Sequence, residues 1–175
     1  ARGPLLRLAT ALAWLPVGTL LGWSVRDLRE PLLPAGLPRQ AAVAHAVFVP
    51  EVRHAVEVQA AEEKHLVGWL SKRLGTRVRI PKLAVHGFEL LGGRLLPESA
   101  RPGAQFMYQD ATGRRLTLYL STDVANRDTA FRYSREGNVH VFYWIDRDVG
   151  YALSGELEKA EMLAVARAVY EQLNP

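Results

Sequence analysis

A run of eighteen residues near the start of the chain, from Leu8 to Val25, contains no ionisable side chain. A helix that crosses a bilayer needs about 20 mostly apolar residues, at about 1.5 Å each. The run reaches this length if it extends back past Arg7, whose charged end can reach the lipid headgroups. Pro16 is better tolerated in a membrane helix than in a soluble one. We therefore expect residues 1–28 to form a single transmembrane anchor.

Two alternatives for this segment are a cleaved signal peptide and a buried helix of a soluble domain. A signal peptide ends close to a small-x-small cleavage site, but the one good candidate, Ala44-His45-Ala46, comes far beyond the apolar run. Trp23 stands near the outer end, where indole rings favour the membrane interface. Gly18 and Gly22 form a G-x-x-x-G spacing, which lets two membrane helices approach closely. Two interpretations of this spacing stay open: a homodimer contact, and the ordinary presence of small residues in a membrane helix.

Composition limits the function classes that remain. The chain has 175 residues, a formal net charge of +4 and no cysteine. Without cysteine there can be no disulfide, no thiolate metal site and no cysteine nucleophile. Arg2 and Arg7 precede the apolar run, which leaves 20 basic residues against 18 acidic ones. Such a balance gives no field that would favour nucleic acid as a partner.

The segment after the apolar run reads as a spacer. Three prolines fall between residues 31 and 38, and each fixes φ and disfavours helix in the residue before it. The valine-rich stretch from Ala41 to Val58 is β-prone, and Pro50 interrupts it, which predicts an edge strand or an extended loop. We therefore expect an extended linker over residues 29–58 and a folded domain over residues 59–175.

The rest of the chain carries one helical pattern, several strand patterns and a closing helix. Apolar residues at 3–4 spacing predict a helix from Glu62 to Leu74, which Gly75 ends. Ser154 is the expected N-cap of the closing helix, which reaches about Gln172. Period-two alternation predicts strands over Phe88–Leu96 with a bulge or bend at Gly92-Gly93, Gln105–Asp110, Arg115–Ser121, Ala130–Arg135 and Val139–Asp146. The expected class is α+β: after the transmembrane helix come a helix, five or six antiparallel strands in a meander, and a C-terminal helix, with the helices on one sheet face.

Patterns that mark enzymes and metal sites are weak. No two of the five histidines have the H-x-x-x-H spacing that places two imidazoles on one helix face. Ser154 lacks the glycine that precedes the serine of a nucleophile elbow by two positions. Asp146 and Asp148 fit a polar turn. We predict no catalytic residue, no metal ligand and no cofactor.

Aromatic residues on the last two predicted strands suggest a contact surface. The candidates are Phe131, Tyr133, Phe142 and Trp144. The alternative, that these rings simply belong to the core, stays open and is the commoner fate of large aromatic side chains. Together with Tyr119 and nearby arginines, such strands also resemble in outline a sheet that stacks bases. A domain outside the cytoplasm would meet no nucleic acid, so none is expected as a partner.

Three parts of the chain point to one family. The first is Phe142–Asp146 followed by Gly150–Leu157 and an amphipathic helix. The second is Val47–His54 with the predicted helix containing His65–Gly75, and the third is Gly87–Pro97. Together they resemble the extracytoplasmic portion of single-pass anti-sigma factors, which control bacterial sigma factors of the extracytoplasmic-function class.

The resemblance implies a membrane-anchored regulator of the bacterial inner membrane, with a periplasmic C-terminal domain that senses an envelope stress. It also implies that a sigma factor is held by a cytoplasmic helical domain upstream of Arg7, which either has been removed from this chain or is lacking in the gene product. Release would follow proteolysis, with a first cut by an envelope protease in the linker from Arg29 to Pro50. Two other roles stay open: a tethered periplasmic structural or assembly protein without signalling, and a membrane-anchored enzyme.

Overall fold

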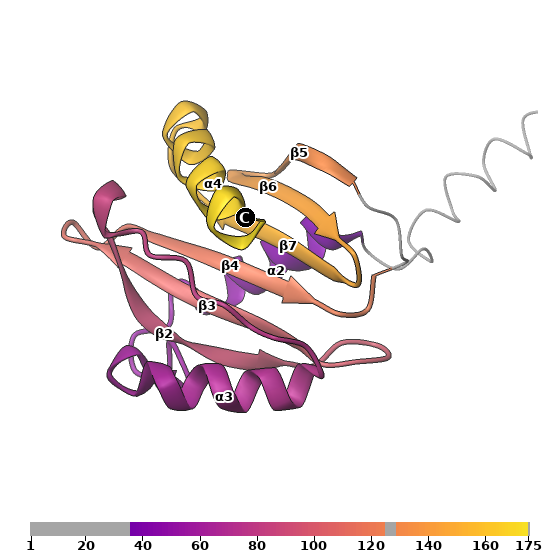
Figure 1. The fold of residues 1–175 in the computed structure, drawn as a ribbon. Coiled ribbons are helices and arrows are strands. Elements are labelled where there is room, and N and C mark those ends of the chain that lie inside the picture. Colours follow the sequence, from indigo (N-terminus) through magenta and orange to yellow (C-terminus); the bar gives the residue numbers. More distant parts are fainter. Residues whose placement is uncertain (1–35, 125–128, 175) are drawn as a thin grey trace, which may run out of the picture. The chain divides into compact units, whose positions relative to one another are not determined.

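The computed structural model describes residues 36–124 and 129–174. These residues form an α+β fold with a seven-stranded antiparallel sheet and α-helices against it (Figure 1). The predicted anchor over residues 1–28, with Gly18 and Gly22, lies outside the described residues. Within the described part, no helix has the length and apolar character needed to cross a bilayer.

The sheet is built from two meanders rather than the single one that was predicted. Its strand order is β1-β2-β3-β4-β7-β6-β5, so the chain leaves β4, passes to the far edge and returns strand by strand until β7 pairs with β4. The elements are α2 (Leu37–Phe48), β1 (Val58–Gln59), η2 (Ala60–Glu62), α3 (Glu63–Leu74), η3 (Ala84–His86), β2 (Phe88–Leu96), β3 (Gly103–Asp110), β4 (Arg115–Ser121), β5 (Thr129–Glu136), β6 (Val139–Asp146), β7 (Val149–Gly155) and α4 (Lys159–Leu173).

One face of the sheet carries the main hydrophobic core. Side chains of α3 and α4 join alternate residues of the strands in a single buried cluster. The predicted alternation of β4 is confirmed, because its three leucines all enter this cluster. The predicted helix α3 is confirmed as well, and Gly75 ends it with a left-handed φ of 69°. The principal helical members of the cluster are Leu66, Leu70, Leu74, Met162, Val165, Val169 and Leu173.

The bulge predicted in β2 is confirmed. The register between β2 and β3 shifts between Leu90 and Gly92. Gly92 has φ 148°, which side-chain-bearing residues rarely adopt, and a Cβ there would collide with the carbonyl oxygen of Val58 in β1. The glycine therefore lets the short strand β1 pair with the bulged part of β2.

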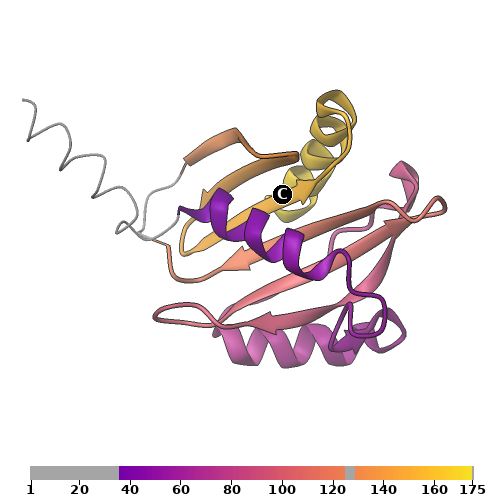
Figure 2. The ribbon, with the colours of Figure 1, turned by 180° about the vertical axis from the view of Figure 1, so that it is seen from behind.

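The opposite face of the sheet is covered by α2, where an extended chain was predicted (Figure 2). The expectation of β-prone structure over Ala41–Val58 is wrong for residues 41–48, which are helical. The extended linker expected over residues 29–58 is wrong for the same residues. Alanine has the highest helix propensity and recurs through this segment. Pro38 stands in the first turn, where proline is tolerated. Helices therefore cover both sheet faces, not one.

Specific contacts hold both ends of α2 on the sheet. At its N-terminus Leu37 lies over Gly150 of β7, where an added Cβ would come within 2.8 Å of Leu37 Cδ2. Just beyond its C-terminus, Arg115 Nη1 donates to the carbonyl oxygens of Val49 and Glu51 at 2.6 and 2.7 Å. These carbonyls belong to the C-cap of α2 and to the turn after it, so Arg115 of β4 fixes the chain at the point where the helix ends.

The predicted start of the closing helix is wrong. Ser154 is not an N-cap but a fully buried residue of β7, and the helix begins five residues later at Lys159. A serine followed by acidic residues is typical of a helix start. The residues up to Gly155 nevertheless form β7, because they pair with β4 on one side and with β6 on the other. Small residues suit β7 because neighbours approach closely: a Cβ on Gly155 would lie 2.9 Å from Met162 Sδ of α4.

His45 joins the middle of α2 to the sheet. It is buried, and its Nδ1 shares a hydrogen bond of 2.9 Å with Thr117 Oγ1 of β4. Burial lowers the pKa of His45 to about 4, whereas an exposed histidine titrates near 6.5. The unfolded chain then binds the proton more tightly, so the folded state is most favoured above pH 6.5 and loses stability as the pH falls towards 4.

We expect the free energy of unfolding, measured with urea, to fall by about 2 kcal/mol between pH 7 and pH 4.5 through His45 alone. The matched control is His45→Asn, which retains a hydrogen-bonding group near the Nδ1 position but cannot take up this proton. All other titrating groups are common to both proteins. The free energy of unfolding of the wild type should therefore fall further between pH 7 and pH 4.5 than that of the variant, by the amount given for His45. Parallel pH profiles would contradict the assignment.

Candidate functional site

The four aromatic side chains that the sequence singled out come together between β5, β6 and α4. The rings of Phe131 and Phe142 stack with centroids 5.4 Å apart, and Tyr133 lies 5.1 Å from Phe142. Tyr170 of α4 meets Phe131 and Trp144 edge-on, at 5.6 and 5.4 Å. Such offset and edge-on contacts stabilise aromatic clusters beyond the area they bury.

Burial divides this cluster into core and surface. Trp144 is 1% exposed and Phe142 is 3% exposed, so the expectation that they form a contact surface is wrong. Both stand on β6, which has a neighbour on each side, and they face α4. Phe131 and Tyr133 are half-buried. Tyr170, 37% exposed, was missed by the sequence analysis because it follows Val169 on a helix whose apolar stripe faces inward.

β5 forms an edge of the sheet and pairs only with β6 (Figure 1). A two-residue turn joins the strands, with Glu136 opposite Val139 and Gly137 at φ 63°. In such a hairpin the closing pair exchanges hydrogen bonds, and alternate residues then point their backbone groups in opposite directions. The N–H and C=O groups of Tyr133 and Arg135 therefore point away from β6. Among the described residues, no strand pairs with this outer side.

Charged side chains surround this edge. Arg132, Arg135 and Lys159 are exposed. Lys159 Nζ lies 4.1 Å from the centre of the Tyr133 ring, and the Tyr133 hydroxyl shares a 2.8 Å hydrogen bond with His140 Nδ1. These two contacts hold Tyr133 in a defined position beside the exposed backbone.

A shallow hollow adjoins the aromatic cluster. Its volume is about 360 Å³, and it is lined by Phe131, Arg167, Tyr170 and Glu171. The two charged residues that line it, Arg167 and Glu171, have opposite signs, so their charges balance. The hollow therefore offers a ligand mainly apolar contact with the aromatic rings. The sequence predicted a contact surface from four aromatic residues. The part of that surface that solvent reaches consists of the edge of β5 and this hollow.

A second polar site surrounds Glu98, on the loop between β2 and β3. Its carboxylate accepts hydrogen bonds from the Tyr119 hydroxyl at 2.6 Å and the Ser121 hydroxyl at 2.7 Å. Burial raises the pKa of Glu98, although these two hydrogen bonds act in the opposite direction. The carboxylate lines a cavity of about 490 Å³ that also includes Trp69 and Arg73. These bonds tie the loop to β4 and account for both hydroxyls.

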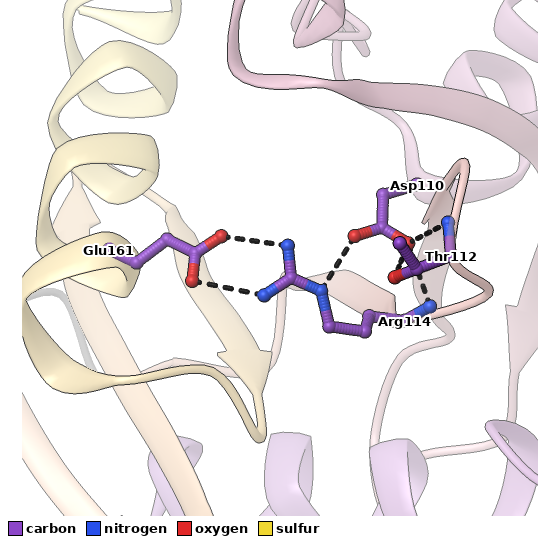
Figure 3. A network of polar contacts seen from close by, with 4 residues as sticks. All are labelled: Asp110, Thr112, Arg114 and Glu161. Carbon is purple, nitrogen blue, oxygen red and sulfur yellow. Dashed lines mark hydrogen bonds and ion pairs between the residues drawn. The ribbon is translucent and has the colours of Figure 1, made fainter.

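A third polar cluster connects the β3–β4 turn with α4 (Figure 3). Arg114 lies between two carboxylates: its Nε donates to Asp110 at 2.6 Å, and its Nη atoms donate to Glu161 at 3.0 and 3.1 Å. Burial would raise the pKa of Asp110, but hydrogen bonds from Thr112 and Arg114 prevail and lower it to about 2. Each charge in this cluster has a partner, which indicates a structural role: the cluster attaches the start of α4 to the β3–β4 turn.

The acidic pair Asp146 and Asp148 lies at the β6–β7 turn, as predicted. Both line a cavity of about 530 Å³ that also contains Arg77 and Arg79. Arg147 between them adopts φ 54°, which the tight turn requires. Charges of both signs line this cavity, so it does not select one class of ion.

The remaining candidates do not converge on one site. Tyr119 contributes to the cluster under α2, whereas Phe131 and Tyr133 pack against the α3–α4 cluster, so these rings do not share a face. Arg115 is occupied by the carbonyls that follow α2, and Arg127 lies outside the described residues. Over residues 36–124 and 129–174, no group of three or more histidine or acidic side chains is placed to hold a metal ion.

Neither the protein-family models nor the curated proteins compared with this chain gave a match. The candidate site therefore rests on geometry alone, and the β5 edge with its half-buried aromatics is the part of it best placed to contact a partner.

We expect the core and surface members of the aromatic cluster to differ sharply in stability measurements. Phe142→Ala should lower the free energy of unfolding by about 3–5 kcal/mol, because it leaves a cavity in the core. Arg132→Ala on the exposed edge should change it by no more than about 0.5 kcal/mol. Urea unfolding of both variants tests this division, and a similar loss in both would contradict it.

Proposed function

We propose that this protein is a membrane-anchored regulator of sigma-factor activity, an anti-sigma factor of the bacterial inner membrane. In this proposal the described residues are its periplasmic domain, and a cytoplasmic region upstream holds the sigma factor. The observation that carries the proposal is the resemblance in Phe142–Asp146 and Gly150–Leu157. These stretches include most of β6 and most of β7, which pair along their length. The resembling residues thus belong to one hairpin rather than to scattered positions.

One feature of the described residues supports this proposal: a distinct helix, α2, comes along the chain after the proposed anchor and before the strands of the sheet. Signalling requires that a ligand or partner bind one conformation of the domain better than another. α2 is the first described element of the chain and is held on the sheet by separate contacts from His45, Leu37 and Arg115. A partner that strengthens or weakens these contacts would change the structure of the chain next to the anchor.

The helix also narrows the proposed cleavage region. A protease groove binds extended chain, and the linker cut was expected between Arg29 and Pro50. Since Leu37–Phe48 is helical and lies on the sheet, cleavage there would first require α2 to detach. We therefore place the first cut before Leu37, in the segment that joins the proposed anchor to α2.

Deletion of the gene should raise transcription from the promoters of the partner sigma factor, and a copy of the whole gene should restore repression. The full-length product, tagged at its C-terminus and purified from membranes, should retain the sigma factor. A periplasmic reporter fused after Pro175 should be active. If purification yields no sigma factor and deletion leaves transcription unchanged, the regulatory role is wrong, and an active reporter would then favour a tethered structural role.

A further inference from the structure

We propose that two copies of this chain associate through their β5 edges, which pair antiparallel about a two-fold axis at Ser134 and join two sheets into one. This inference goes beyond the proposed regulatory function; the geometry of the pairing does not depend on that function, whereas its strength and its test in membranes rest on the proposed anchor. It rests on the outward backbone groups of β5, on the self-complementary charges along the strand, and on the end of regular pairing before Arg132.

The backbone restricts which residues can meet across such an interface. An added strand must bond to the outward N–H and C=O groups of Tyr133 and Arg135. In a two-fold pairing centred on Ser134, Tyr133 of one copy faces Arg135 of the second copy, and both have outward groups. Each such pair exchanges hydrogen bonds in both directions, so the axis at Ser134 satisfies the exposed groups of both strands.

Side chains favour this centre over its neighbours. Pairing centred on Ser134 places Arg132 opposite Glu136 of the second copy, twice by symmetry, and opposite charges at facing positions stabilise a strand pair. A centre at Arg135 would place two arginines opposite each other. A centre at Tyr133 would place Arg132 opposite Ser134 and would extend into residues 129–131, where the register with β6 is irregular.

The proposed partners are already positioned for this contact. Glu136 Oε1 accepts a 3.0 Å hydrogen bond from Ser134 Oγ of the same strand, which holds the carboxylate on the face of β5 where Arg132 also lies. On the other face, Arg135 of one copy would reach the ring of Tyr133 in the second. Arg132 and Arg135 are exposed. Arg135 Nε donates a 3.0 Å hydrogen bond to the carbonyl oxygen of Gly137 in the turn, and the contact with Tyr133 would have to form beside this bond or replace it.

The contact is short, so it should be weak between freely diffusing molecules. Regular pairing with β6 covers only Arg132 to Glu136 of β5, and stable soluble dimers usually bury far more surface than five residues provide. Anchoring in one membrane would raise the local concentration of the strand edges and favour the pairing.

A cysteine at the axis tests this arrangement directly, because the chain has no cysteine of its own. Facing residues at Ser134 would form a non-hydrogen-bonded pair with Cα atoms about 4.5 Å apart, within the range that a disulfide spans. We expect full-length Ser134→Cys in membranes to oxidise to a covalent dimer. The matched control is Asn138→Cys in the turn, whose two copies would lie about 27 Å apart.

Charge reversal then tests the register. In the Ser134→Cys background, Arg132→Glu and Glu136→Arg should each lower the cross-linked fraction several-fold, because like charges would face each other. The double variant Arg132→Glu/Glu136→Arg should restore it. Urea unfolding would establish that each variant is folded. Three outcomes would overturn the proposal. The first is equal cross-linking through position 138, and the second is a double variant that does not restore cross-linking. The third is undiminished cross-linking with Glu136→Arg, which is expected if the edge binds an acidic peptide instead.

Discussion

The pairing of β4 with β7 holds the fold together. It runs from Leu116 opposite Gly155 to Ser121 opposite Gly150 and joins the meander β1–β4 to the meander β5–β7. The chain between these strands has to reach the far edge and return, so this central contact forms between residues distant in sequence. Both helical layers depend on it, because α2 on one face and the α3–α4 cluster on the other extend over strands of both meanders.

The two faces of this sheet are stabilised in different ways. On the α3–α4 face, large apolar side chains interlock in one cluster, and their burial is the main source of stability. Under α2 the sheet is more polar, and the helix contributes mostly alanines. There the attachment relies on directional contacts such as His45 with Thr117 and Arg115 with the carbonyls beyond α2. Protonation of His45 disfavours the folded state, whereas apolar burial carries no titrating group, so the attachment of α2 is more sensitive to pH than the α3–α4 core.

The aromatic cluster shows which features of a site sequence periodicity can predict and which it cannot. Alternation along β6 placed Phe142 and Trp144 on one face, and this face exists. Whether that face meets solvent or α4 is decided by where the closing helix returns, which no local pattern specifies. The exposed feature lies one strand further out, on β5, because strand order leaves its outer side without a neighbour among the described strands. Edge position is a property of topology rather than of side-chain type.

Local sequence signals by themselves determined α3 with its glycine stop, the bulge of β2, and the bounds of β4 and β6, since each follows from the chemistry of adjacent residues. Tertiary structure alone decided that Leu37–Phe48 is a helix on the sheet, that Gly150–Gly155 is a central strand, and that helices cover both faces. The reason is physical: both segments mix residues of opposite preference, with alanines that favour helix next to valines that favour strand, or glycines next to β-prone residues. Long-range burial and pairing between distant strands then select the conformation.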